Sequence, residues 1–277
     1  PHLNLQFSIG NAPILIWNPS LTSTSSANLA NYFMSQGFGN YDYIISEEIP
    51  NTANYHSAFI FLGIHPENYQ LMQTDAIAIV NILDRGGNVY LEGGDTWVFN
   101  DATDLHPYFH IEGISDGTAD LTSISGAENT FTEGMNFTYS GTANWIDRIA
   151  PLDGAQVLLR NIEPEYATAV IYEDALGYKT IGSSHELGGL SGAQFTEYID
   201  GMVNFFDFDA QDLCSTGDLN NDSMINVLDV VRVVSIILST GAQETIQEIC
   251  AADINGDGDL NVMDVVMLMH GILQSSQ

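Results

Sequence analysis

The chain of 277 residues carries 36 acidic and 5 basic side chains, which gives a formal net charge of −31. Five cations cannot neutralise a run of phosphates, so nucleic acids and anionic membrane surfaces are excluded as partners. Hydrophobic residues make up 45% of the chain, so a disordered acidic protein is excluded as well. The length predicts one large domain and one small one.

The segment 1–12 precedes the predicted large domain. The chain begins at Pro1 without Met and without a basic-then-apolar leader, which indicates a processed product or a fragment of a longer protein. Residues 3–9 alternate apolar and polar side chains, which predicts a strand with one apolar face. This strand belongs to the edge of the main sheet, belongs to a preceding domain, or is donated to a neighbouring molecule. These three interpretations stay open.

Residues 13–210 alternate strand-like and helix-like patterns, which predicts an α/β fold with a mostly parallel sheet flanked by helices, amidotransferase-like or flavodoxin-like in type. Residues 100–150 are rich in Gly, Ser, Thr and Asp, which predicts an insertion of loops and short strands. The last two predicted strands form a hairpin across residues 174–177. Strands are predicted at 14–17, 41–45, 58–62, 88–92, 156–160, 167–172 and 178–183, and helices at 20–36, 74–85 and 195–206.

Two segments of this region carry a resemblance. The runs Gly86-Gly-Asn-Val-Tyr-Leu-Glu-Gly-Gly-Asp95 and Tyr178-Lys-Thr-Ile-Gly-Ser-Ser-His-Glu-Leu-Gly-Gly189 resemble the class I glutamine amidotransferase-like fold. In the active family, a Cys on a strand-to-helix elbow works with a His-x-Glu pair. The elbow would fall near residues 92–96, where neither Cys nor Ser occurs, and Glu186 follows His185 without a spacer. Cysteine-based hydrolysis is therefore excluded in this domain, and no catalytic residue is assigned.

A group of acidic and histidine side chains remains at or near the predicted strand ends. Ligand sites in open α/β sheets gather outside the carboxyl ends of the strands, so a metal or acid–base site is one interpretation. The other is a set of solvated carboxylates and hydrogen-bonded histidines. No P-loop or His-Glu-x-x-His motif is present. The group comprises Glu92, Asp95, His106, His110, Glu173, Asp174, His185 and Glu186.

An internal repeat near the C-terminus, after a predicted linker at 211–217, is the strongest signal in the sequence. Residues 218–238 and 253–273 are offset by 35 positions and share 10 of 21 residues. Each copy begins with a loop of 12 residues that is rich in Asp and Asn and runs into an apolar stretch. Residues 218–277 are therefore predicted to form a small all-α module of two loop–helix units.

Both loops place oxygen-bearing side chains at positions 1, 3, 5, 9 and 12, and a backbone carbonyl at position 7. Ca²⁺ prefers about six to eight hard oxygen ligands, and this spacing wraps them around one ion. One such loop could be an Asx-rich turn that caps a helix, but two copies in register predict two calcium ions. Position 12 is Asp in both, where the usual EF-hand has Glu. The predicted ligands are Asp218, Asn220, Asp222, Met224, Asn226 and Asp229, and then Asp253, Asn255, Asp257, Asp259, Asn261 and Asp264.

The repeat resembles a type I dockerin over residues 214–277. That family has two Ca²⁺ loop–helix units with Asp at position 12, and its members are secreted modules that attach enzymes to cohesin-bearing scaffolds. Positions 10 and 11 of each loop contact the cohesin in the family. The basic residues common on the following helix are missing, so a partner other than cohesin stays open. The resemblance implies an apolar partner-binding set of Val227, Leu228, Val262 and Met263.

The two cysteines, Cys214 and Cys250, precede their loops by four and three residues, so they occupy equivalent positions. In a secreted module this equivalence predicts a disulfide that links the two units. Met263, Met267 and Met269 form either an adaptable binding face or the packing between the two helices.

Three functions follow from these features, all of them extracellular. The first is a non-catalytic interaction protein whose calcium-loaded module docks the α/β domain to a scaffold, a neighbouring copy or a larger polypeptide. The second is a secreted hydrolase of carbohydrate or peptide that uses Glu92, Asp95 or His185 and is attached through its dockerin. The third is a structural subunit of a fibre, in which contacts between copies build a head-to-tail chain. The missing nucleophile favours the first.

Overall fold

The structure is a computed structural model, and two compact units make up the chain. Residues 12–32 and 42–207 form one unit, and residues 208–277 belong to the other. Among the helices that the structure describes, none is both long and apolar enough to cross a membrane. The predicted strand at 3–9, both cysteines and residues 211–216 of the predicted linker lie outside the described residues. The described residues are 14–36, 38, 40–175, 177–208, 217–220, 224–238, 251–255 and 259–275.

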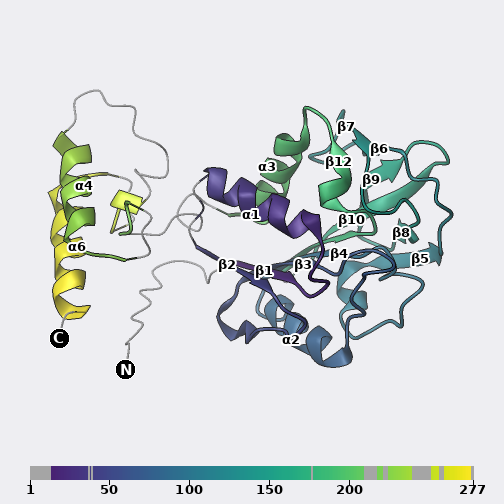
Figure 1. The fold of residues 1–277 in the computed structure, drawn as a ribbon, viewed down its shortest axis with the longest axis horizontal. Helices are drawn as coiled ribbons and strands as arrows, with labels where there is room; N and C mark the ends of the chain where they lie inside the picture. Colours follow the sequence, from purple (N-terminus) through teal and green to yellow (C-terminus); the bar gives the residue numbers. More distant parts are fainter. Residues whose placement is uncertain are drawn as a thin grey trace. The chain divides into compact units, whose positions relative to one another are not determined.

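One side of the sheet in the large unit consists of parallel strands. β1 (Ile14–Asn18), β3 (Ser57–Phe61), β4 (Asn88–Glu92) and β11 (Lys179–Ser183) are neighbours in that order, and β2 (Tyr41–Ile45) lies next to β1 (Figure 1). The pairs β1–β3, β3–β4 and β4–β11 are parallel. These four strands are buried along their whole length, as expected of parallel strands with helices on both faces.

Helices cover both faces of the parallel strands. α1 (Thr24–Gln36) and α3 (Phe195–Phe205) lie on one side, and α2 (Gln73–Leu83) lies on the other (Figure 1). Successive side chains of a strand point to opposite faces, so Ile60 of β3 joins the core beneath α2 while Phe59 points away from it. The predicted α/β fold with flanking helices is confirmed.

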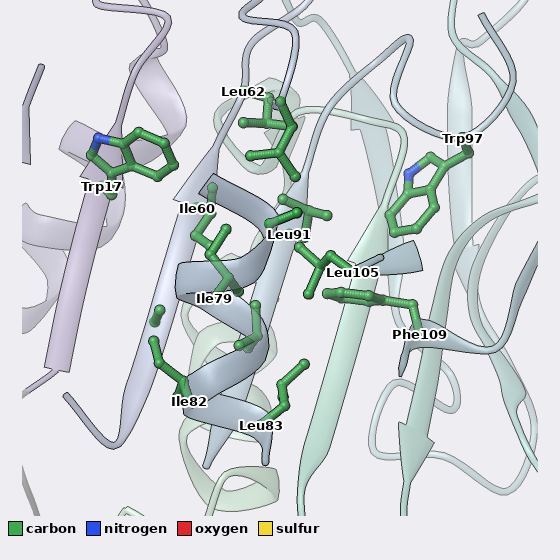
Figure 2. Close-up of a cluster of buried hydrophobic side chains, with 14 of the residues drawn as sticks. Trp17, Ile60, Leu62, Ile79, Ile82, Leu83, Leu91, Trp97, Leu105 and Phe109 are labelled. Atoms are coloured by element: carbon green, nitrogen blue, oxygen red, sulfur yellow. The ribbon is translucent and has the colours of Figure 1, made fainter. Parts of the chain in front are cut away.

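A large hydrophobic core fills the space between α2 and the sheet. Figure 2 shows that side chains of α2 face those of the strands, while two aromatic residues from the loops after β4 close one end. Burying one Leu, Ile or Phe side chain stabilises a fold by about 1.5–3 kcal/mol. This cluster therefore holds the loops after β4 on a rigid base. Its labelled members are Trp17, Ile60, Leu62, Ile79, Ile82, Leu83, Leu91, Trp97, Leu105 and Phe109.

Beyond β11 the sheet continues with antiparallel strands, so the sheet is mixed. β10 (Tyr166–Glu173) pairs antiparallel with β11, which confirms the predicted hairpin. The sheet then runs through β9, β6, β7 and β12, while β8 pairs with β10 and β5. The predicted insertion supplies most of these short strands. Their bounds are β5 (Ile111–Ser115), β6 (Ser123–Gly126), β7 (Asn136–Tyr139), β8 (Arg148–Pro151), β9 (Gln156–Asn161) and β12 (Leu190–Ser191).

The second unit contains the two predicted helices, each following its loop. α4 (Val227–Leu238) and α6 (Val262–Ser275) share a small core, to which Val233, Ile236 and Leu268 contribute buried side chains. The opposite sides of both helices expose apolar residues. The sequence pattern therefore produces a pair of helices with one face packed and another face uncovered.

Candidate functional site

The last position of the first loop, Asp229, organises that loop. Its side chain is fully buried. Oδ1 accepts hydrogen bonds from the backbone N–H groups of Leu219 at 2.9 Å and Asn220 at 3.4 Å, and Oδ2 accepts one from Asn226 N–H at 2.8 Å. The carboxylate thereby ties positions 2, 3 and 9 of the loop to position 12. This arrangement holds the start and the end of the loop together.

The second loop repeats this arrangement. Asp264 is also fully buried. Its Oδ1 accepts from the N–H groups of Ile254 at 2.9 Å and Asn255 at 3.4 Å, and its Oδ2 accepts from Asn261 N–H at 2.9 Å. The two loops are therefore equivalent in hydrogen bonding as well as in sequence.

Position 9 joins each loop to its helix. Asn261 Oδ1 accepts from Met263 N–H at 2.8 Å, which caps α6, and its Nδ2 donates to the Asp259 carbonyl at 2.8 Å. Asn226 makes the same two bonds, to Leu228 N–H at 2.8 Å and to the Met224 carbonyl at 3.1 Å. The capping role considered for the sequence is therefore real, and it brings positions 7 and 9 together.

The chemistry of these loops fits a hard cation. Asp218, Asp229 and Asp264 are buried carboxylates, and a buried carboxylate is costly unless a cation or hydrogen bonds compensate its charge. Asp222 and Asp257, the ligands predicted at position 5, lie outside the described residues. Within the described ranges no three acidic, histidine or cysteine side chains form a ready cation cluster.

In the α/β domain, two of the candidate carboxylates are part of a buried network. Glu92, at the end of β4, accepts hydrogen bonds at Oε2 from Tyr90 Oη at 2.9 Å and from Leu187 N–H at 2.7 Å. Burial raises the pKa of Glu92 to about 8. Glu186 accepts from Tyr139 Oη at 3.1 Å and Thr142 Oγ1 at 2.8 Å. These contacts link neighbouring segments of the fold.

His185 lies in the same buried region. Its Nδ1 is 3.1 Å from Ser183 Oγ and 3.2 Å from the Thr168 carbonyl. Burial lowers its pKa to about 4, so the imidazole is neutral at ordinary pH. Its side chain is 0% exposed and that of Glu92 is 1% exposed, so neither reaches solvent.

The other predicted candidates are spread over the domain and have structural partners. His106, in η2 (His106–Phe109), binds Thr103 N–H and the Thr96 carbonyl, both at 2.9 Å. His110 stacks on Tyr172 with ring centroids 3.8 Å apart. Glu173 pairs with Lys179 at 3.7 Å, and Asp174 accepts from Tyr172 Oη at 3.0 Å. The structure therefore does not gather the eight candidates into one site.

Asp95 differs from the rest of this group. It lies on the loop after β4, is 7% exposed, and receives no hydrogen bond at its carboxylate from the described residues. Burial raises the pKa of Asp95. The charge of Asp116 acts in the same direction, and the charge of His65 acts in the opposite direction. Neither His65 nor Asp116 belongs to a sequence motif, because they come from separate loops that only the fold brings together.

A comparison with protein-family models decides the nature of the second unit. Residues 216–273 match the model of the dockerin type I domain. These residues form a type I dockerin domain. The match confirms the predicted resemblance for this part of the chain. Dockerins of this type bind calcium and dock onto protein partners. A comparison with curated proteins found no match.

The dockerin presents the predicted partner-binding residues on its surface. Val227 and Leu228 at the start of α4 are 66% and 59% exposed, and Val262 and Met263 at the start of α6 are 71% and 52% exposed. Met267 and Met269 are also exposed. The packing between the helices uses Leu268 instead, so the methionines belong to the uncovered side.

Solved structures resemble the large unit in fold alone. A β-galactosidase from Rahnella sp. R3 matches 72% of this chain with 10% identity and a TM-score of 0.50, and the match spans 32% of that enzyme. A putative GMP synthase protein from Thermoplasma acidophilum matches 72% of this chain and 96% of its own, with 8% identity and a TM-score of 0.49. A putative ThuA-like protein from Parabacteroides merdae covers 70% and 90%, with 9% identity and a TM-score of 0.47.

Proposed function

We propose that this chain is an extracellular docking component, in which the dockerin attaches the α/β domain to a cohesin-type protein. The observation that carries this proposal is the pair of equivalent loops, in which Asp229 and Asp264 are buried and bonded in the same way. The acidic surface of the rest of the chain suits a soluble protein outside the cell.

Each loop holds one calcium ion in this proposal. Carboxylate and amide oxygens at positions 1, 3, 5, 9 and 12 supply the hard ligands that Ca²⁺ prefers, together with the carbonyl at position 7. Bound calcium also neutralises charge in a module that contains nine acidic residues and one basic residue, Arg232. Docking therefore depends on calcium, because the ion fixes the loop from which the helix begins.

The docking face consists of the residues at positions 10 and 11 of both loops. These four side chains are apolar and mostly exposed, so burying them against a partner is favourable at about 25 cal/mol per Å² of area removed from water. Recognition by burial implies an apolar patch on the partner. A second copy of this chain is a less suitable partner, because both copies carry a large negative charge.

A catalytic function has less support from the described residues. Glu92 and His185 are buried in internal hydrogen bonds, so a substrate cannot contact them in this conformation. The fold similarity to β-galactosidase concerns about a third of that enzyme at 10% identity, which gives no argument for its activity.

Biolayer interferometry against a panel of immobilised cohesins, with Ca²⁺ and with a chelator, tests the proposal. We expect at least one cohesin to bind the full chain with Ca²⁺ and to release it on chelation. The double variant Val227→Asp and Val262→Asp abolishes binding, whereas Ile162→Asp, which changes an exposed residue of the α/β domain, leaves it unchanged. Binding that survives both chelation and the double variant contradicts the proposal, and self-association by light scattering would favour the fibre.

A further inference from the structure

Tyrosine side chains are the main hydrogen-bond partners of the carboxylates in the α/β domain. The chain contains 12 tyrosines, and the hydroxyl groups of eight of them donate to an Asp or Glu side chain. Tyr55 Oη lies 2.6 Å from Asp42 Oδ2, for example. The eight pairs are Tyr32–Asp200, Tyr55–Asp42, Tyr69–Asp75, Tyr90–Glu92, Tyr108–Asp84, Tyr139–Glu186, Tyr166–Asp120 and Tyr172–Asp174.

Basic side chains provide far fewer partners. Residues 14–207 contain 25 acidic and four basic side chains. Of these four bases only Arg85 is exposed, and it donates to two backbone carbonyls, at 3.0 and 3.1 Å. The other three form ion pairs with carboxylates, and they are Arg148, Arg160 and Lys179.

The surface of this domain is therefore almost entirely negative. Of its 25 acidic residues, 18 are exposed. No basic residue lies in the last turn of α1, α2 or α3, where a cation would stabilise the helix. Like charges at this density repel one another and lower the stability of the compact state. Dissolved salt weakens the repulsion, because the screening length falls from about 8 Å at 0.15 M to about 3 Å at 1 M.

Salt acts differently on the two kinds of carboxylate partner. In the ion pair of Arg160 and Glu165 the N and O atoms are 2.9 Å apart, and the side chains are 35% and 68% exposed, so salt screens their attraction. A phenol hydroxyl is neutral, and its hydrogen bond to a carboxylate acts only at short range. The tyrosine pairs therefore hold the carboxylates through contacts that salt does not weaken.

We propose that the α/β domain is built to fold in a saline medium and that ionic strength sets its stability. Salt removes the repulsion between the exposed carboxylates, while the tyrosine–carboxylate bonds persist. The two observations are independent, because the repulsion comes from exposed residues, whereas the bonds also include buried carboxylates such as Glu92 and Glu186. This dependence on salt belongs to the α/β domain and does not require any docking partner.

Thermal unfolding of the full chain at constant calcium, in NaCl from about 0.05 to about 2 M, tests the proposal. We expect the melting temperature of the α/β domain to rise by more than about 5 °C and to level off once the charges are screened. Hydrogen exchange within residues 14–207 assigns the transition to this domain. A melting temperature that is unchanged or lower at the highest salt concentration would overturn the proposal.

A variant with fewer charges separates screening from the general effect of salt on proteins. It replaces five exposed acidic residues with their amides, which keep the shape of the side chains. We expect it to melt above the wild type at low salt and at the same temperature at high salt. An equal rise with salt in both proteins would identify exclusion of the salt from the protein surface as the cause, and would also overturn the proposal. The substitutions are Glu47→Gln, Glu48→Gln, Glu67→Gln, Asp101→Asn and Glu128→Gln.

Two further variants compare the two kinds of partner. Tyr55→Phe removes the hydroxyl that binds Asp42, and we expect a melting temperature lower by about 3–6 °C at low and high salt alike. Arg160→Gln removes an ion pair, so we expect a loss of at most about 3 °C at low salt and none at high salt. Tyr108→Phe removes a hydrogen bond of the first kind nearer the surface and gives the same comparison if Tyr55→Phe does not fold. A loss in the tyrosine variants that disappears in salt would contradict the role of these bonds.

Discussion

Asp229 and Asp264 lie 35 residues apart in sequence and have the same surroundings. Each is fully buried, and each accepts backbone N–H bonds from positions 2, 3 and 9 of its own loop at distances that agree within 0.1 Å. A helix cap requires no such tie back to the start of the loop. These repeated hydrogen bonds to position 12 favour a loop that closes around an ion. Substitutions within one loop can test this interpretation.

Replacing Asp264 with Ala removes a predicted ligand and three hydrogen-bond acceptor contacts at once. We expect the second loop to lose its calcium, and the backbone amides of α6 to exchange faster by hydrogen–deuterium exchange, while residues 14–207 keep their protection. Unpaired buried N–H groups cost about 1–3 kcal/mol each, so the change exceeds a loss of metal alone.

The matched control is Asp259→Ala in the same loop. Position 7 contributes its backbone carbonyl, so removal of this side chain should leave calcium binding and exchange of α6 close to those of the wild type. If Asp259→Ala impairs calcium binding as much as Asp264→Ala, the ligand assignment is wrong.

Glu92 predicts a dependence of domain stability on pH. Burial raises its pKa to about 8 from an ordinary 4.5, so the folded state retains a proton that the unfolded state releases. The stabilisation is complete below pH 4.5 and decreases as the pH rises through 8, by up to about 1.4 kcal/mol per pH unit. Glu92→Gln lacks this proton equilibrium. The melting temperature of the variant minus that of the wild type should therefore increase as the pH rises.

The exposed residue Glu112 provides the control for this measurement. Thermal unfolding of Glu112→Gln should follow the wild type at every pH from about 5 to 9, whereas the curve of Glu92→Gln diverges from it. A constant difference between Glu92→Gln and the wild type over this range would show that Glu92 is ionised in the folded domain.

Asp147 is fully buried, and its Oδ2 accepts hydrogen bonds from the N–H groups of Trp97 and Val98, both at 2.8 Å. This residue therefore predicts a large effect on stability. Ala at this position leaves the buried N–H groups of Trp97 and Val98 without an acceptor, so we expect a loss of about 2–4 kcal/mol in the free energy of unfolding. Asn keeps an oxygen that accepts both bonds, so Asp147→Asn should lose much less. Urea denaturation measures both, and equal losses in the two variants would exclude the hydrogen bonds as the cause.

A disulfide between Cys214 and Cys250 stays a prediction. The Gly217 N–H donates to the Ala251 carbonyl at 2.9 Å, so described residues close to both cysteines are in contact. A bridge that closes a loop of this length stabilises a module by about 2–4 kcal/mol. Mass spectrometry before and after reduction should show a gain of two hydrogens, with a lower melting temperature of the dockerin. Two free thiols in protein isolated from its natural host would refute the bridge.

Most of the fold could be predicted from the sequence because its signals are local. The apolar runs at β3 and β4 and the helix of α3 begin and end within a residue or two of their predicted bounds. The antiparallel pairing of β9 with β6 could not be predicted, because it joins residues 124–126 to residues 159–161, which are far apart in the sequence.

The two candidate sites differ in how far the sequence reveals them. The dockerin loops are local motifs, so their calcium ligands could be predicted from spacing alone. In the α/β domain, Glu186 accepts hydrogen bonds from Tyr139 and Thr142 of a distant segment, and no spacing rule connects these residues. Burial also changes the meaning of Glu92 and His185, which the sequence offers as accessible groups and the fold encloses.

Calorimetric titration of the full chain with Ca²⁺ tests the central claim most directly. Two equivalents of calcium should bind to the wild type, and one equivalent should remain in Asp229→Ala and in Asp264→Ala alike. Binding of two equivalents in both variants, or of none in the wild type, would contradict a docking module built on two calcium loops.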